Sequence, residues 1–596
     1  MSKPQDSSAE SRQRVAEQRP GQSPRARRPE HQVAEADTVM FASARPIVRA
    51  DGRPGLAPGP DEEAAGRTVP GPAGDVVVPA PRRGRHRHRA GVELLPALPA
   101  SHPRRIWLSR GVLLLILIMQ AALTLRMQNS AFEDEALYLY VGHLEIAHWL
   151  HGASLLGDYP SYFSGAPVLY PVLGAFADSI GGLAAARAVS LAEMLAATAL
   201  LYTMSRRLFN ERVGLCAAVI FSVAEPTLFL GHLATYDASA LFLLALAAWV
   251  VVRTAEFRWP VYLLAAPLAA SAVATKYASL LFVPCVIALA GVAAWPRSRR
   301  KALIAPVALA LATAGVLAGT LRVAGPDYWR GIESTTLARV QSTASVTSLL
   351  WDITQWIGLP FALAVIGAVA YTIRPATETG EQIASAGSRL RRAALGAVMA
   401  GSALLAPAEQ IRIHTVVSLQ KHVGFGLLFA APIAGVGMAR IIGDHFRRAQ
   451  IGIAMWGAAL VLGMTQANDL FNVWPNSTAL AADMAGHLRP GAHYLVEADE
   501  VPIYYLRRHA DAQPNQFTST YNFGYVDKQG RYLTGDAAYV AAIQAGYFQI
   551  VTFDYGTTPA VDTLIAHSLA ADPHYRLADV ISETNGGRQY VWIKST

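Results

Sequence analysis

Long apolar runs recur along most of this 596-residue chain, and they constrain its fold more than any other feature. Of the residues, 52% are hydrophobic and only 16% are charged, against roughly 25% charged residues in soluble domains. The first run, 106–127, reaches about 33 Å as a helix, enough to cross about 30 Å of hydrocarbon. Further runs lie at 183–205, 213–231, 237–254, 260–276, 279–295, 302–323, 349–373, 393–407, 423–441 and 450–467. We therefore expect a polytopic α-helical membrane protein with about eleven or more spans.

The apolar runs leave a hydrophilic segment at each end of the chain. Residues 1–105 are rich in Pro, Arg, Gly and Ala, a composition that buries too little apolar surface to offset the entropy of ordering. We expect a disordered basic tail there and a transmembrane domain at 106–467. Residues 468–596 alternate strand-like and helix-like segments, which predicts a small α/β domain. Its buried strands are expected at 491–499, 548–554 and 587–594.

Basic residues gather in one set of the loops between the runs, which the positive-inside rule places in the cytoplasm. They are Arg104/Arg105, Arg206/Arg207/Arg212, Arg253/Arg258, Arg297/Arg299/Arg300/Lys301, Arg389/Arg391/Arg392 and Arg447/Arg448. The tail is then cytoplasmic, while the loops 128–182, 324–348 and 407–422 and the C-terminal domain are extracytoplasmic. Pro and Gly interrupt the stretch 167–180, so we expect it to lie at the interface or re-enter rather than span.

Composition and motifs also exclude several classes of protein. The net charge of +8 comes from the tail and short loops, so it orients the chain among membrane lipids and does not indicate a nucleic-acid partner. Cys216 and Cys285 lie inside apolar runs, which excludes a disulfide framework or a cysteine zinc site. No P-loop, dinucleotide-binding, zinc-protease or nucleophile-elbow motif occurs.

Three adjacent carboxylates, Glu133, Asp134 and Glu135, follow the first run within a few residues. Their mutual repulsion beside hydrocarbon favours a general base or a cation site. The alternative is an acidic, solvated loop end that holds the chain outside. The apolar flank 136–141 argues against simple solvation.

Two further charges lie in tight turns between runs on the same outer side. Asp237 and Lys276 stand at membrane level, where charges are costly and are usually paired or functional. Asp237 serves equally well as a helix N-cap, and Lys276 as an interfacial lysine. Their common depth favours a shared site.

A cationic stretch, 408–426, lies at the outer mouth between two runs and contains Glu409, Arg412, His414 and Lys421. Its Arg and Lys side chains suit a phosphate group. The alternative is attraction to lipid head groups. Arg187, near the outer start of another run, either binds an anion or extends to the interface.

Together these segments resemble the GT-C superfamily of membrane glycosyltransferases, in particular glycosyltransferase family 39, the protein mannosyltransferases and aminoarabinose transferases. The matching segments are FEDEALY (132–138), APVLYPVLGAF (166–176), AAARAVS (184–190), ATYDA (234–238), ATKYASLLFVP (274–284) and SLQKHVGFGLLFAAP (418–432). In that family a single Asp–Glu pair usually stands in the first loop. Here Glu133 precedes the pair, so the choice among the three carboxylates stays open.

The resemblance implies transfer of a sugar, with inversion, from a polyprenyl-phosphate carrier to an acceptor hydroxyl at the outer face of a bacterial cytoplasmic membrane. The catalytic group is then sought among Glu133, Asp134, Glu135 and Asp237. Donor-phosphate contacts are expected from Lys276, Arg412, Lys421 and Arg187. Acceptor or sugar contacts are expected from Tyr138, Glu409 and His414.

Several features stay open at this point. The acceptor is a protein, a lipid or a polysaccharide, and a divalent metal at the carboxylates has no ligand signature in the sequence. A membrane transporter and a non-catalytic cell-envelope assembly protein are the alternatives. A transporter predicts an inverted repeat and charges near the bilayer midplane, neither of which is clear in the sequence.

Overall fold

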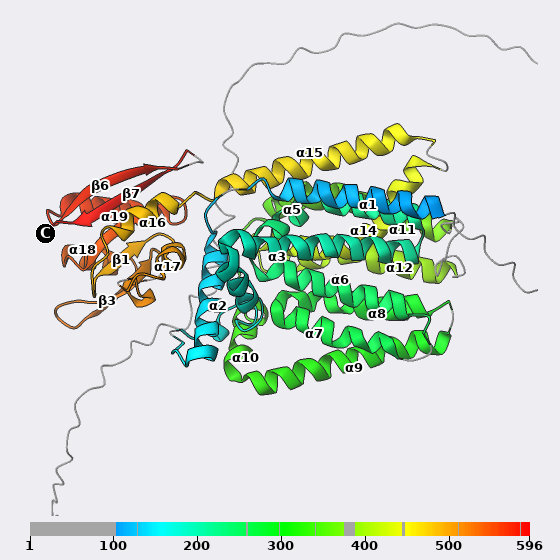
Figure 1. Ribbon diagram of the computed structural model, residues 1–596, viewed down its shortest axis with the longest axis horizontal. Helices are drawn as coiled ribbons and strands as arrows, with labels where there is room; N and C mark the ends of the chain where they lie inside the picture. The colour runs from blue at the N-terminus through cyan, green and yellow to red at the C-terminus, as the bar shows by residue number, and fades with distance from the viewer. Residues whose placement is uncertain are drawn as a thin grey trace, which may run out of the picture.

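The computed structural model describes residues 103–595 except 128, 156, 258–259, 297, 340, 375–387, 444–446, 511, 522 and 584–585. The predicted tail, 1–105, lies almost wholly outside the described residues. The rest forms a bundle of long helices with a small α/β domain at one end of the bundle (Figure 1).

Helices account for the whole region between the tail and the α/β domain. They are α1 (Pro103–Thr124), α2 (Glu133–His151), η2 (Tyr159–Ser161), α3 (Tyr170–Leu208), α4 (Glu211–Val223), α5 (Glu225–His232), α6 (Tyr236–Thr254), η3 (Val261–Leu264), α7 (Ala265–Thr275), η4 (Tyr277–Phe282), α8 (Val283–Ala294), α9 (Arg299–Ala324), α10 (Pro326–Ile332), η5 (Glu333–Leu337), α11 (Val346–Ile373), α12 (Arg389–Ser402), α13 (Leu405–Arg412), α14 (Leu419–Ile442) and α15 (Ala449–Val473).

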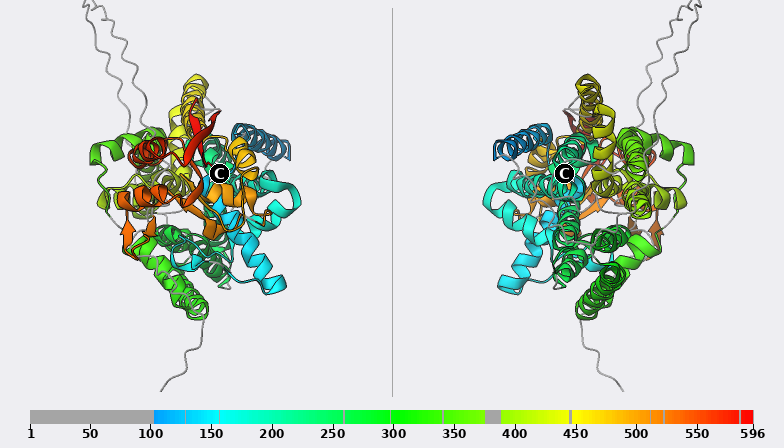
Figure 2. Two further views of the ribbon diagram at one scale, coloured as in Figure 1. Left: turned by 90° about the vertical axis from the view of Figure 1, so that its left-hand side faces the viewer. Right: turned by 90° about the vertical axis from the view of Figure 1, so that its right-hand side faces the viewer.

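All of the predicted apolar runs fall on these helices. In the described part of the chain, eight helices are long and apolar enough to cross a membrane, and up to ten if the bent pairs α4–α5 and α12–α13 each form one span. The expected run at 260–276 corresponds to the shorter apolar segment Val261–Thr275. The polytopic helical fold is therefore confirmed. Viewed along the bundle, the long helices appear end-on (Figure 2).

Small residues bring the central helix α14 close to α11. A Cβ atom on Gly367 would lie 1.9 Å from the Ile433 carbonyl oxygen, and one on Gly437 would lie 2.1 Å from the Leu363 carbonyl oxygen. Such backbone approach is how apolar helices pack without a hydrophobic driving force between them.

Two helical segments lie at the end of the bundle that is next to the α/β domain. The helix α2 runs across that end (Figure 1). The first part of α3, 170–180, is separated from the long part by a break at Gly181 and Gly182, where Gly182 has a φ of 67°. This stretch, predicted to be interfacial or re-entrant, is thus a helix that bends before the span.

The α/β domain contains a five-stranded sheet in the order β2-β1-β5-β7-β6. Strands β2, β1 and β5 run parallel to one another, and β7 runs antiparallel to both of its neighbours, β5 and β6. Its elements are α16 (Thr478–Ala485), β1 (His493–Val496), α17 (Glu500–Leu506), η7 (Pro514–Gln516), β2 (Phe517–Ser519), β3 (Gly524–Val526), β4 (Tyr532–Thr534), α18 (Asp536–Gln544), β5 (Phe548–Phe553), α19 (Pro559–Ala571), β6 (Tyr575–Ser582) and β7 (Arg588–Lys594). The helices α16 and α17 pack on one face of the sheet, and α18 and α19 on the other. The three predicted strands are β1, β5 and β7.

The first loop is fastened to the linker that leads into this domain. Asn129 Nδ2 donates to the carbonyl oxygens of Phe471 at 2.6 Å and of Trp474 at 2.7 Å. Trp474 Nε1 donates to the Ala131 carbonyl oxygen at 2.9 Å, and its ring meets that of Phe132 edge to face. These contacts hold the start of α2 against the end of α15 and the linker that follows it.

Candidate active site

The first turn of α2 carries the three predicted carboxylates, and all three are buried. Their position suits the positive end of the helix dipole. The structure nevertheless directs them to three different surroundings.

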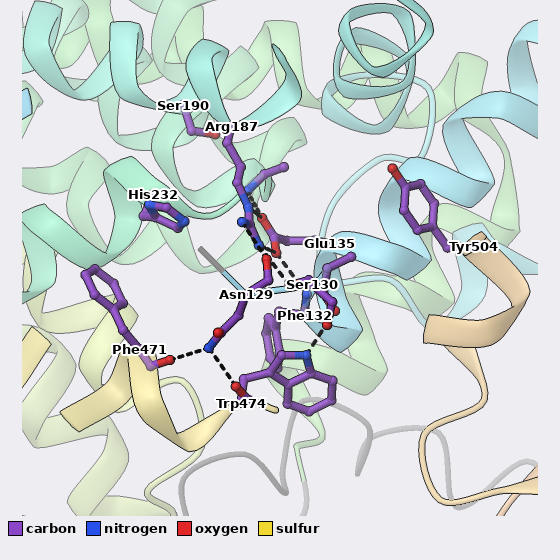
Figure 3. Close-up of polar contacts among 12 residues, drawn as sticks. Asn129, Ser130, Phe132, Glu135, Arg187, Ser190, His232, Phe471, Trp474 and Tyr504 are labelled. Carbon is purple, nitrogen blue, oxygen red and sulfur yellow. Dashed lines mark hydrogen bonds and ion pairs between the residues drawn. The ribbon is translucent and has the colours of Figure 1, made fainter. Parts of the chain in front are cut away.

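Glu135 is held in a network that the sequence did not predict (Figure 3). Arg187 forms two bonds to it, Nε to Oε1 at 2.8 Å and Nη2 to Oε2 at 2.7 Å. The backbone N–H groups of Phe132 and Ala234 donate to the same carboxylate at 2.9 and 2.7 Å. Burial acts to raise the pKa of Glu135, but the Arg187 charge and these hydrogen bonds together lower it. Glu135 is therefore an ionised carboxylate whose two oxygens are both engaged.

Arg187, predicted to bind an anion, is a member of this same network. Its Nη1 and Nη2 also donate to the carbonyl oxygens of Asn129 and Ser130 at 3.1 and 3.0 Å. Arg187 thus joins α3 to the first loop, and its partner is a carboxylate of the chain itself.

Glu133 faces the α/β domain. The pKa of Glu500 is raised well above its ordinary value by burial, then by the charges of Asp499 and Glu133. Glu133 therefore lies close to α17 and borders the α/β domain.

Asp134 forms an ion pair with Lys421, which comes from the first turn of α14. Both side chains are almost wholly buried. The hydroxyl of Tyr138, one turn further along α2, donates to Asp134 Oδ1 at 3.3 Å. The ammonium group of Lys421 also lies 5.6 Å from the ring centre of Phe132.

Asp237 and Lys276 form a second ion pair, with Nζ 2.5 Å from Oδ1. The Lys276 ammonium lies 4.8 Å from the ring centre of Tyr236. The predicted shared site of these two charges corresponds to a direct contact. Lys276 is therefore not a lone ammonium, because its partner is a carboxylate of the chain.

Backbone hydrogen bonds fix Lys276 from both sides. Ala166 N–H donates to the Ala274 carbonyl oxygen and Tyr277 N–H to the Ser164 carbonyl oxygen, each at 2.8 Å. The loop after α2 thereby borders the turn that carries Lys276.

Two tyrosines connect the ion pairs. The Tyr138 and Tyr236 hydroxyls are hydrogen-bonded at 2.5 Å, with Tyr138 accepting when its own proton goes to Asp134, and the Tyr236 hydroxyl also hydrogen-bonds Ser164. We call the two ion pairs and the two tyrosines between them the Asp–Lys cluster. Its members are Asp134, Tyr138, Tyr236, Asp237, Lys276 and Lys421. The sequence did not predict Tyr236 or Ser164, although Tyr236 directly precedes Asp237 in the ATYDA turn.

The remaining predicted residues lie apart from the cluster. Arg412 donates to Glu409 on the same helix at 2.9 and 2.6 Å, and both side chains are exposed. His414 has a φ of 50° and its Nδ1 lies 3.1 Å from the Ala344 carbonyl oxygen. Among the described residues, these three have no recorded contact with the Asp–Lys cluster. Residues close in this stretch of sequence are thus divided between a surface pair and a buried site.

The arrangement combines two carboxylates that can accept a proton with two ammonium groups that can bind an anion. Each charge is compensated within the chain, so no net charge is left buried. An incoming phosphate can accept hydrogen bonds from the lysines and would then share their charge with the aspartates, because each ammonium has three N–H donors. Within 103–595, apart from the gaps given above, no group of three or more His, Cys, Asp or Glu side chains is arranged to hold a metal ion.

The chain is similar to known membrane glycosyltransferases in sequence and in fold. The family model described as dolichyl-phosphate-mannose-protein mannosyltransferase matches residues 167–321. The crystal structure of ArnT from Cupriavidus metallidurans bound to undecaprenyl phosphate matches 82% of this chain and 98% of that chain, with a TM-score of 0.51 and 14% identity. The chain has the GT-C fold. The expected resemblance to this superfamily is confirmed.

Other matches are weaker. The oligosaccharyltransferase of Archaeoglobus fulgidus in the apo form matches 83% of this chain and 75% of that chain, with a TM-score of 0.47 and 13% identity. No curated protein sequence matches the chain significantly. The GT-C assignment rests on the family model and the ArnT fold.

Proposed function

We propose that the chain is a membrane glycosyltransferase that moves a sugar from a polyprenyl-phosphate carrier to an acceptor hydroxyl at the extracytoplasmic face, with Asp134 as the base. The observation that carries the proposal is the Asp–Lys cluster, in which a carboxylate and two ammonium groups converge. The fold shared with ArnT, which was crystallised with undecaprenyl phosphate, supports a lipid-linked phosphate as donor.

Among the first-loop carboxylates, Asp134 fits the role of base best. Glu135 is held by a bidentate arginine and two backbone N–H groups, so a proton transfer would have to break that network. Glu133 borders the α/β domain. Asp134 pairs with Lys421, whose ammonium can also turn to a phosphate, and accepts a 3.3 Å hydrogen bond from Tyr138.

The donor phosphate competes with the two aspartates for Lys421 and Lys276. As Lys421 turns toward the phosphate, Asp134 loses its counter-ion and becomes free to accept a proton. Both ammonium groups then stabilise the negative charge that grows on the departing phosphate.

The transfer is a single displacement. The acceptor oxygen forms a bond to the anomeric carbon while its proton passes to Asp134. The bond between that carbon and the phosphate oxygen breaks, and the carrier leaves as its phosphate. Attack from the face opposite the phosphate inverts the anomeric configuration. Tyr138 and Tyr236 position Asp134 and border the space where the acceptor approaches.

The proposal leaves other roles to the remaining cationic residues. Arg187 is a positioning residue, because its contacts with Glu135 hold the turn of α2 that presents Asp134. Arg412 is placed with Glu409 at the surface and is not included among the phosphate contacts.

The test is complementation of a strain that lacks the chain, with lipid-linked sugars and glycans measured by mass spectrometry. We expect the strain to accumulate a polyprenyl-phosphate sugar and the wild-type chain to remove it. Asp134→Asn should fail to do so while inserting normally, with activity reduced by at least about a hundredfold. Asp158→Asn, in an exposed part of the same loop, is the matched control and should complement fully.

Full complementation by Asp134→Asn would exclude Asp134 as the base. A non-catalytic assembly protein would also tolerate that variant. A transporter would instead change the distribution of the lipid-linked sugar across the membrane without changing its glycan products.

A further inference from the structure

A cavity of about 220 Å³ lies in the α/β domain at the carboxyl ends of the neighbouring parallel strands β1 and β5. The chain leaves β1 through α17 on one face of the sheet and leaves β5 through α19 on the other face. Connections that diverge in this way open a crevice between the two strands, and ligands of open α/β sheets bind there. The cavity therefore occupies the place where this topology favours a ligand.

One end of the cavity is acidic. Glu497 follows β1 directly, and Asp554 follows β5 directly. Glu497 accepts hydrogen bonds from the N–H groups of Asp554 at 2.7 Å, of Thr558 at 3.0 Å and of Thr557. Burial, then hydrogen bonding to Glu497 and its charge, raises the pKa of Asp554 to about 9. At neutral pH the pair is one carboxylate and one carboxylic acid.

This pair is unsuited to a metal ion. The N–H groups already occupy the oxygens of Glu497 and point their positive ends at it, which would repel a cation. Asp554 carries a proton, and its Oδ2 accepts from Gln589 Nε2 at 3.0 Å. The carboxylic acid of Asp554 and the amide of Gln589 together provide both donors and acceptors, which matches the hydroxyl groups of a sugar.

The rest of the cavity is apolar. Trp474, Leu480, Val501 and Pro502 contribute to its lining. A sugar ring has the same division, because its C–H groups form an apolar face and its hydroxyls form the rim. Aromatic and aliphatic walls bind such a face by contact and by excluding water.

A buried hydroxyl below the cavity adds a second observation. Val496 lines the cavity and lies opposite Thr552 on β5, so both side chains belong to the same face of the sheet. Thr552 Oγ1 is buried and has no hydrogen-bond partner among the described residues. Thr552 itself does not line the cavity, and buried hydroxyls are rarely left in this state, so a water between this hydroxyl and the cavity is expected.

The cavity also adjoins the Asp–Lys cluster's own loop. Trp474 contributes to the lining and donates to the Ala131 carbonyl oxygen, three residues before Asp134. A group bound in the cavity therefore lies beside the segment that carries the proposed base.

We propose that this cavity binds a neutral sugar ring of the acceptor, which makes the acceptor a carbohydrate or a glycosylated molecule. The inference rests on the proposed glycosyl transfer for its biological meaning, whereas its test uses binding alone. Glu497 and Glu583 line the site and disfavour an anionic sugar by repulsion.

The test measures binding to the full chain in lipid nanodiscs by saturation-transfer difference NMR. The probes are methyl glycosides of mannose, galactose, glucose and arabinose, with glucuronate as the anionic probe. We expect at least one neutral glycoside to bind and glucuronate not to bind. Gln589→Ala should weaken that binding about five- to tenfold by removing a hydrogen-bonding group, and Ala498→Trp should abolish it by filling the cavity.

Gln529→Ala, in the exposed β3–β4 hairpin of the same domain, is the matched control and should leave binding unchanged. Absence of binding by every probe, binding of glucuronate as strong as that of the neutral glycosides, or binding insensitive to both cavity variants would overturn the inference. The Asp134→Asn variant should keep wild-type sugar binding, so failure of the proposed base and failure of this site give different results.

Discussion

Each lysine of the Asp–Lys cluster neutralises a buried aspartate, and under the proposed function each also receives the donor phosphate. Removing one lysine affects both tasks, so a single substitution does not separate them. A double variant that also replaces the paired aspartate separates the two tasks, because it removes the buried charge that the lysine neutralises.

We expect Lys276→Met to destabilise the protein by about 3 to 5 kcal/mol, because it leaves the buried Asp237 carboxylate without its counter-ion. Adding Asp237→Asn should restore most of that stability and should not restore donor binding. Thermal unfolding and a titration with a polyprenyl-phosphate sugar, both on purified protein in nanodiscs, measure the two effects. Recovery of donor affinity in the double variant would show that Lys276 acts on Asp237 alone.

A second expectation concerns the pH dependence of the α/β domain. The raised pKa of Asp554, about 9 in the folded domain against about 3.9 for an ordinary Asp, means that its protonated form favours folding. That contribution is full below about pH 4 and is lost as the pH rises toward 9. We expect the domain to lose about 1 to 3 kcal/mol of stability between pH 6 and pH 9, and Asp554→Asn to lose less.

Thermal unfolding followed by near-ultraviolet circular dichroism across this pH range provides the measurement. Asp562, whose pKa burial and then the Glu497 charge raise to about 8, should leave a smaller slope in the variant. An unchanged dependence of stability on pH in Asp554→Asn would contradict the assignment of the proton to Asp554.

At the scale of elements, the contact between the loop after α2 and the turn after α7 controls where Lys276 lies. A Cβ atom on Gly165 would lie 1.9 Å from the Thr275 carbonyl oxygen. Gly165→Ala should therefore move the two segments apart and lower transfer activity more than tenfold, although Gly165 has no side chain in the cluster. Gly315→Ala in α9, where nothing lies within 4 Å of the added carbon, is the control and should remain active.

The elements themselves were largely predictable. Each apolar run became a helix because only helices satisfy their own backbone hydrogen bonds in hydrocarbon. The 64° bend between α4 and α5 was not predicted, although Pro226 at the start of α5 is a local signal for it.

The contents of the candidate site were predictable only in part. Asp134, Asp237, Lys276 and Lys421 were singled out because charges are rare and costly at that depth. Their pairing was not predicted, since Asp134 and Lys421 are 287 residues apart and sequence spacing carries no information about which helix ends meet. In the sequence, the charge of Arg412 indicated a functional site as much as that of Lys421 did, but the structure places Arg412 at the surface.

At the scale of the whole molecule, the one-sided distribution of basic residues predicts the orientation. Reporter fusions at Gly380, between α11 and α12, and at Gly530, in the α/β domain, should report opposite sides of the membrane. Alkaline phosphatase is expected to be active at Gly530 only and a cytoplasmic reporter at Gly380 only. The same side for both positions would refute the layout.

The fastening of the first loop has a consequence for the order of events during synthesis. The hydrogen-bond acceptors of Asn129, the carbonyl oxygens of Phe471 and Trp474, are synthesised 342 and 345 residues later. At about 5 to 20 residues per second, the ribosome needs about 17 to 70 s to supply them. During that interval the nascent helix α2 has Arg187 available as a partner but lacks its contacts with the end of α15 and the linker. A chain released after Lys421 but before the last span is complete therefore contains every cluster residue and still lacks these contacts, so we expect such a truncated product to be inactive.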